Sequence, residues 1–166
     1  MTPMVKLTDL IDALEMESEE WGSWLDRHTG QIVAIETDVI HAVEAVGEDV
    51  VAEKINAGTD EELGAARAIC AGDPRYLALP TQFDFHEYRS MEKFIGAVAD
   101  AGKADQLWRA IKGKGAFRHF KDTAHRLDLI KDWYRYRDDA MNEFMLRWAE
   151  VNQVAVDRTP RGSIQP

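Results

Sequence analysis

The chain has 166 residues, a formal net charge of −10 and 45% hydrophobic residues. A chain of this length buries roughly 70% of the surface that its unfolded form exposes, so it can fold without covalent staples. The single cysteine, Cys70, excludes an internal disulfide framework and a cysteine-based zinc ribbon. Because no window approaches the roughly 18 apolar residues of a membrane span, and MTPMVKLTDL has no apolar signal segment, we expect a cytoplasmic protein without a membrane partner.

Charge is divided unevenly along the chain. Residues 1–108 contain 8 Lys and Arg against 22 Asp and Glu, whereas residues 109–137 contain 9 against 3. Acidic surface repels phosphate, which argues against a protein that binds nucleic acid over its whole surface. The charge distribution is still compatible with one local basic binding site within residues 109–137.

The first expected elements are an extended segment at residues 4–7, a helix and a β-hairpin. In EWGSWLDRHTGQIVAIE, two runs rich in Trp, Ile and Val flank a turn that ends at Gly30, where glycine suits a positive φ. A lone hairpin is marginal in water, so we expect Val5–Leu7 to supply a third strand or to pair with another molecule. In the second case the protein forms a homodimer, or binds a partner protein, through the hairpin edge.

Helical spacing dominates the remainder. We predict helix over residues 38–71 with breaks at Gly47 and Gly58, then an extended RYLALP, then helices near 85–98, 103–112, 116–127 and 129–152. The predicted fold class is α+β and predominantly helical, with a small N-terminal antiparallel hairpin or three-stranded sheet packed against a helical bundle. Residues 1–152 are expected to form a single domain, followed by a mobile tail at 153–166.

Three polar residues in FDFHEYRSME, namely Asp84, His86 and Glu87, are candidates for a polar site. Asp84 followed three residues later by Glu87 also has the form of a capping box, with Phe83 and Tyr88 as the accompanying hydrophobic staple. The residue four positions after His86 is serine, so the zinc-protease pattern is absent. We predict helix capping here, and no metal, cofactor or catalytic residue. The absence of a recognisable catalytic motif in the sequence favours a protein that is not an enzyme, and it leaves an enzymatic activity as an alternative.

The stretch KGKGAFRHFKD, residues 112–122, lacks the spacing and the final hydroxyl residue of the phosphate loop GxxxxGK[ST]. Its glycines predict the end of one helix and the start of the next. A helix N-terminus is already partly positive, yet this one is surrounded by Lys112, Lys114, Arg118 and Lys121. These residues are candidates for binding an anion: a carboxylate of the same chain, a phosphate-bearing ligand or nucleic acid, or an acidic partner protein.

The stretch DWYRYRDD interleaves aromatic residues with Arg135 and Arg137, as single-strand nucleic-acid binders do. Its three aspartates argue against such binding. We predict an amphipathic helix instead, with Trp133 in the core and Arg135 paired to Asp139 four residues later.

The chain resembles the uncharacterised bacterial protein family numbered 0158 over about residues 5–152. Five stretches carry the resemblance, in this order: VKLTDLIDALE, WLDRHTGQIV, RYLALPTQFDFHEYRSMEKFI, GKGAFRHFKD and DWYRYRDDAMNEFMLRWAEVN. The most specific is the pattern G-[KR]-GAFR-x-FKD followed by a WY pair. The resemblance implies a bacterial, single-domain, mostly helical protein with an N-terminal hairpin, and it brings no activity, cofactor or catalytic residue.

Together these observations lead us to expect a non-enzymatic cytoplasmic binding or regulatory protein that acts through protein–protein contacts or self-association. Binding of a phosphate ligand or nucleic acid at residues 112–121 is the alternative. An enzyme that uses Asp84, His86 and Glu87 is the second alternative.

Overall fold

The computed structural model describes residues 3–46 and 60–160, and its fold class is α+β and predominantly helical, as predicted. The chain divides into two compact units, residues 1–81 with 145–166 and residues 82–144. Helix α9, Ile130–Val151, contributes to both. The extent of a single domain, residues 1–152, stays a prediction. The expected breaks at Gly47 and Gly58 lie outside the described residues.

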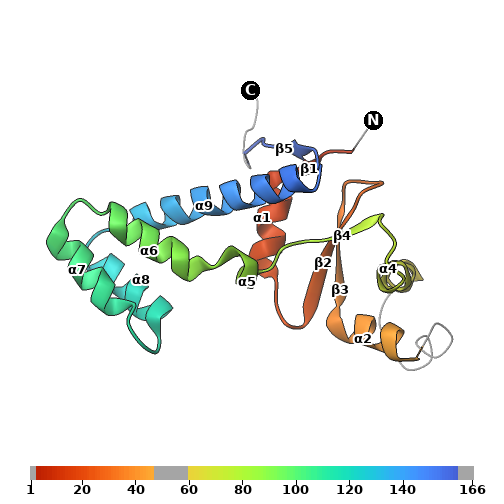
Figure 1. Cartoon of the computed structure of the whole chain (residues 1–166), viewed down its shortest axis with the longest axis horizontal. Coiled ribbons are helices and arrows are strands. Elements are labelled where there is room, and N and C mark those ends of the chain that lie inside the picture. Colours follow the sequence, from red (N-terminus) through yellow and green to blue (C-terminus); the bar gives the residue numbers. More distant parts are fainter. Residues whose placement is uncertain (1–2, 47–59, 161–166) are drawn as a thin grey trace. The chain divides into compact units, whose positions relative to one another are not determined.

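The first unit contains a three-stranded antiparallel sheet (Figure 1). Strands β2, Trp21–Asp26, and β3, Ile32–Glu36, form the predicted hairpin, and β4, Tyr76–Ala78, pairs with the other side of β2. In the turn, Gly30 has a φ of 75° and its N–H donates to the carbonyl of Asp26 at 2.8 Å. The hairpin is therefore confirmed, including the need for glycine at its last turn position.

The prediction that Val5–Leu7 supplies the third strand is wrong. Strand β1, Val5–Lys6, pairs in parallel with β5, Val156–Asp157, and Leu7 already begins helix α1, Leu7–Met16. The third strand of the sheet comes from the RYLALP stretch, which was expected only to be extended. Residues 156–157 lie in the predicted mobile tail, and the mobility of that tail stays a prediction.

Helices α2, Thr37–Val46, and α4, Asp60–Cys70, join one face of the sheet in a hydrophobic cluster (Figure 1). Side chains alternate along β3, so Val33 and Ile35 contribute to this cluster. Opposite Ile35 lies Gly22, where an added Cβ would stand 2.5 Å from Cη2 of Trp24. Any larger residue there would force the indole ring of Trp24 to move.

An ion pair joins β4 to the end of β2. The guanidinium of Arg75 donates to both carboxylate oxygens of Asp26, from Nε to Oδ1 at 2.9 Å and from Nη2 to Oδ2 at 2.8 Å. The N–H of His28 also donates to Oδ1 at 2.9 Å. These hydrogen bonds, those from Arg75 first, hold the pKa of Asp26 well below its usual range although burial opposes them. The pair holds the residue that precedes β4 against the end of β2.

The second unit consists of helices. These are α5, Gln82–Phe85, α6, Glu87–Ala97, α7, Ala101–Ala110, α8, Ala116–Arg126, and the first part of α9. The four longer helices agree with the predicted ranges to within about two residues, which is the usual uncertainty of helix ends. The short helix α5 was not predicted.

An aromatic cluster forms the core of the second unit. Trp133 is fully buried, as predicted, with ring centroids 4.9 Å from Phe120 and 5.5 Å from Phe94 in edge-to-face geometry. Tyr136 extends the cluster, 5.5 Å from Phe94. Such pairs add about 0.5–1.5 kcal/mol each beyond the apolar area that they bury.

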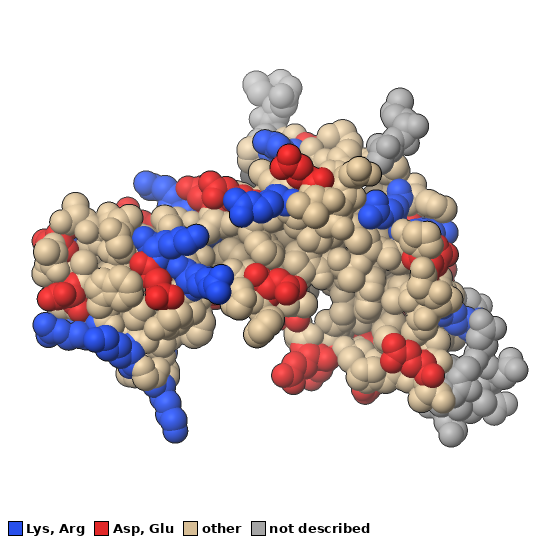
Figure 2. All heavy atoms as spheres, viewed as in Figure 1, with Lys and Arg blue, Asp and Glu red and all other residues tan. Residues whose placement is uncertain are grey.

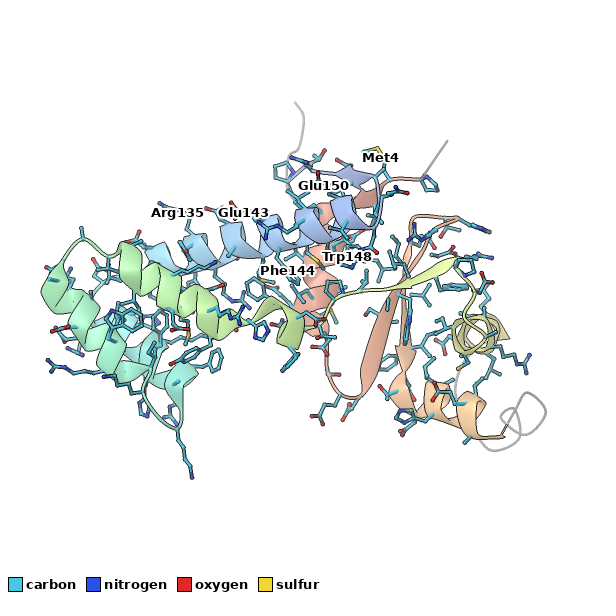
Figure 3. All side chains as sticks on the ribbon, viewed as in Figure 1. Met4, Arg135, Glu143, Phe144, Trp148 and Glu150 are labelled. Atoms are coloured by element: carbon cyan, nitrogen blue, oxygen red, sulfur yellow. The ribbon has the colours of Figure 1, made fainter. Side chains whose placement is uncertain are left out.

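Helix α9 is amphipathic within the second unit, as Figure 3 shows. Arg135 and Glu143 lie on one side, whereas Phe144 lies on the other and packs edge-on against Phe85 at 5.4 Å. Neither α9 nor any other described helix is both long and apolar enough to cross a membrane.

Candidate binding sites

The basic stretch of the sequence forms the joint between α7 and α8. Gly113 and Gly115 have φ values of 90° and 72°, and Gly115 is the N-cap residue of α8. No acidic residue occupies the first turn of α8, and no side chain caps its free amides. The predicted role of the two glycines, to end one helix and begin the next, is confirmed.

The cations at this joint are exposed. Within the described part of the second unit, Lys112, Lys114 and Lys121 have no ion-pair partner, and Arg118 has only Asp122, one turn further along α8 at 4.0 Å. An exposed pair of this kind contributes little. On the face shown in Figure 2, Lys and Arg side chains gather over the helices of this unit. The joint is thus a basic surface on which, among the described residues, Asp122 is the one carboxylate that pairs with a cation of the stretch.

The capping box predicted in FDFHEYRSME is wrong. Asp84 lies inside α5, and the N-cap residue of α6 is His86, whose φ of 55° is left-handed and whose side chain makes no capping hydrogen bond. Phe83 is 79% exposed, and its ring lies 5.2 Å from that of His86 at an interplanar angle of 49° instead of forming a staple. The left-handed residue between two helices is a tertiary feature that the local pattern does not contain.

Asp84, His86 and Glu87 have different surroundings, and a polar site formed by them stays a prediction. Asp84 and His86 are exposed, whereas Glu87 is mostly buried and accepts a hydrogen bond from Nε of Arg137 on α9 at 2.5 Å. No cluster of three or more His, Cys, Asp or Glu able to hold a metal occurs in residues 3–46 and 60–160. Glu87 therefore joins α6 to α9 through Arg137.

The hairpin has an open edge along β3. Among the strands that the structure describes, the order β3-β2-β4 leaves β3 with β2 as its single neighbour. The N–H of Asp26 donates to the carbonyl of Gln31, and the N–H of Thr37 donates to that of Glu20. These two bonds show which alternate residues of β3 direct their backbone groups toward β2. The backbone groups of Ile32, Ala34 and Glu36 therefore face away from β2. The backbone groups of Ile32 and Ala34 and the N–H of Glu36 have no backbone partner among the described residues, whereas the carbonyl of Glu36 precedes α2 and accepts the first hydrogen bond of that helix.

The two ends of this edge differ in charge. Glu36 is exposed at one end, together with Glu20 of the preceding loop. Arg27 and His28 are exposed in the turn at the other end. An antiparallel strand with the same polarity of charge would match both ends.

A cleft of about 480 Å³ opens among α6, α7 and α9 of the second unit. Its apolar lining comes from Phe94, Val98, Leu129 and Tyr136. Its charged lining comes from Asp100 and Lys103 at the start of α7 and from Asp132, Arg135 and Asp139 on α9. Clefts of this volume, apolar with a few charged groups, are typical small-molecule sites.

Sequence reasoning did not identify this cleft. Asp132, Arg135 and Asp139 recur at spacings of three and four residues, which places them on one face of α9. That spacing is the signal that the sequence contains for a shared polar face, but it also fits an exposed ion pair between Arg135 and Asp139, which is the pair predicted from the sequence. The predicted ion pair between Arg135 and Asp139 does not occur in the described structure. Only the fold brings this face opposite Lys103.

The surroundings of Cys70 disfavour its thiolate. Its Sγ lies 3.7 Å from the carbonyl of Ile40, in the hydrophobic cluster of the first unit. Burial, helped by the carboxylate of Glu44, raises the pKa of the thiol. Thiolate is the reactive form, so this environment lowers reactivity.

A model of the uncharacterised protein family UPF0158 matches residues 1–159, and the chain belongs to that family. Among curated proteins, it is similar to the UPF0158 protein PA5073 of Pseudomonas aeruginosa, with 28% identity over 79 residues. The alignment covers 46% of this chain and 52% of that relative, about half of each. No solved structure matches the chain.

Proposed function

We propose that the protein is a non-enzymatic binding protein that self-associates through the edge of β3. The observation that carries the proposal is the row of outward-facing backbone groups at Ile32, Ala34 and Glu36. Such a row is a template for another strand. The occupant we propose is a second copy of this chain, because the edge has an acidic end and a basic turn.

The proposed register is antiparallel and centred on Ala34. Ala34 then stands opposite Ala34 of the second copy, and Glu36 stands opposite Ile32, so that no like charges face each other. The Ala34 pair forms two backbone hydrogen bonds and each Glu36–Ile32 pair forms one, because the carbonyl of Glu36 is already used by α2, which gives about four backbone hydrogen bonds. The acidic end of each strand lies beside the basic turn of the other copy.

Cysteine cross-linking tests this register. In a Cys70→Ser background, Ala34→Cys places two thiols in one hydrogen-bonded pair with Cα atoms about 5.5 Å apart, within disulfide range. The control, Glu36→Cys on the same edge, places its two thiols at least about 13 Å apart. We expect a covalent dimer from the first variant under mild oxidation and none from the second.

A variant that blocks the edge completes the test. Ala34→Pro removes an N–H that β2 does not use, so the hairpin is retained while strand addition is blocked. Ala34→Thr keeps the N–H and serves as the control. Sedimentation equilibrium is expected to give a dimer for Ala34→Thr and a monomer for Ala34→Pro. A wild-type protein that is monomeric at 100 μM, or equal cross-linking of both cysteine variants, refutes the proposal.

The exposed cations of the α7–α8 joint favour a second candidate function, binding of a phosphate-bearing ligand. The supporting observation is that Lys112, Lys114 and Lys121 lack carboxylate partners in the described part of the second unit. Counterion release makes such binding strongly salt-dependent. Inorganic triphosphate at 100 times its Kd is expected to raise the unfolding midpoint by several degrees at low salt, corresponding to about 2.7 kcal/mol.

Two variants locate this second site. The double variant Lys114→Ala, Arg118→Ala is expected to lose the shift in the midpoint. Lys131→Ala, which removes an exposed cation outside the joint, is expected to keep it. A shift that survives the double variant, or that does not change with salt, excludes the joint as the binding site.

A further inference from the structure

We infer that the cleft among α6, α7 and α9 binds a small zwitterion with an aromatic body, of the α-amino-acid type. The inference concerns residues 82–144 and does not depend on pairing through β3. It rests on three properties of the cleft: its volume, its aromatic wall and the placement of its unpaired charges.

The volume and the wall set the size and polarity of the ligand. About 480 Å³ accommodates an aromatic amino acid with some bound water, and lies within the range of small-molecule sites. Phe94 and Tyr136 line the cleft with their rings 5.5 Å apart and inclined at 59°. Rings in this geometry accept a third ring edge-on, so the apolar part of the ligand is expected to be aromatic.

The rigidity of this wall comes from the aromatic core behind it. Trp133 is fully buried and contacts both Phe94 and Tyr136, at 5.5 and 6.5 Å between centroids. Phe94 is itself 6% exposed. A site whose side chains are already held by packing loses little entropy when it binds a ligand.

The charges of the cleft set the polar ends of the ligand. Lys103 on α7 has no carboxylate partner among the described residues, and neither Asp132 nor Asp139 on α9 has a cationic one. Asp100, in contrast, is occupied, because its Oδ1 accepts from the N–H of Lys103 as the N-cap of α7. The α9 wall thus carries two carboxylates and the guanidinium of Arg135, a net negative charge, and its carboxylates lie more than 4 Å from the ammonium of Lys103.

A zwitterion satisfies both walls at once. Its carboxylate binds the ammonium of Lys103, and its ammonium group binds the aspartates of α9. A ligand with one charge leaves one wall unpaired, which costs affinity because charged groups beside an apolar surface interact more strongly than in bulk water. Charge placement therefore distinguishes an amino acid from an aromatic acid or an aromatic amine.

Three matched probes test the inference by isothermal titration of the full chain. These are L-phenylalanine, 3-phenylpropionate, which lacks the ammonium group, and phenethylamine, which lacks the carboxylate. We expect L-phenylalanine to bind at least fivefold more tightly than either analogue. Lys103→Gln is expected to weaken L-phenylalanine at least fivefold while leaving phenethylamine unchanged, and Asp139→Asn to weaken L-phenylalanine while leaving 3-phenylpropionate unchanged.

The control is Lys93→Gln, an exposed cation on α6 that does not line the cleft. Lys103 and Asp139 are at the surface of the cleft, so their variants are expected to melt within about 2 °C of wild type by circular dichroism. Absence of binding at 10 mM L-phenylalanine refutes the inference. It is equally refuted if either analogue binds as tightly as L-phenylalanine, or if Lys93→Gln weakens binding as much as Lys103→Gln.

Discussion

Replacement of Asp26 by alanine is expected to destabilise the first unit through the loss of its ion pair with Arg75. The carboxylate accepts two hydrogen bonds from Arg75 and one from the N–H of His28, all at 2.8–2.9 Å. Hydrogen bonds to a charged group contribute about 1.5–3 kcal/mol each. The side chain of Asp26 is 7% exposed but that of Arg75 is 36% exposed, so water partly replaces the lost partner. We expect a loss of about 2–3 kcal/mol, below the 3–5 kcal/mol of a fully buried pair.

The difference between wild type and Asp26→Ala also depends on pH in a defined direction. The folded-state pKa of Asp26 is depressed, so its contribution to stability is complete above the ordinary carboxyl pKa of about 3.9. As the pH falls below this value, the unfolded chain takes up a proton before the folded chain does, and the contribution decreases. We therefore expect the same difference at pH 6 and pH 7, and a smaller one at pH 2.5.

Urea unfolding followed by tryptophan fluorescence measures this difference, because Trp21 and Trp24 lie on β2. Exchange of the Leu79 amide, which donates to the carbonyl of Ser23, reports locally on the contact between β4 and β2. Asp105→Ala, which removes a 71% exposed carboxylate, is the control and is expected to cost less than about 0.5 kcal/mol. A loss below 0.5 kcal/mol for Asp26→Ala, or a difference that persists undiminished at pH 2.5, contradicts the reasoning.

Three further predictions concern backbone geometry and the thiol. Gly22→Ala is expected to cost about 1–3 kcal/mol in urea unfolding, because its Cβ would stand 2.5 Å from Trp24 and force the ring to move; an unchanged midpoint refutes this. His86→Gly is expected to stabilise by about 1 kcal/mol, because a φ of 55° costs a residue with a side chain more than it costs glycine, and a lower thermal midpoint argues against it. The rate at which iodoacetamide alkylates Cys70 is expected to keep rising above pH 9, because burial and Glu44 raise the thiol pKa; a plateau below pH 8.5 contradicts this.

Local patterns were sufficient for the elements whose signals are local. The hairpin turn at Gly30 and the helix joint at Gly113 and Gly115 were predicted from glycines at positions of positive φ, and each of these residues has such a φ. Trp133 was placed in the core from helical periodicity, and it is fully buried. Turn chemistry and periodicity act within a few residues, so one sequence contains them.

The failures concern contacts between distant segments. The partner of Asp26 is Arg75, and the partner of Val5 is Val156, pairings that no local pattern indicates. The capping-box pattern at Asp84 was overridden because His86 adopts a left-handed conformation between two helices. The cleft was missed for the same reason, since its two charged walls belong to α7 and α9.

The parallel pairing of β1 with β5 has a consequence for biosynthesis. Val5 leaves the ribosome early, whereas its partner Val156 is translated about 150 residues later. At 5–20 residues per second, the first strand waits about 8–30 s for its partner. Residues 82–144 are complete before Met145 and the rest of the first unit are made. The unit that holds β1 and β5 can therefore close only after residues 82–144 have been made.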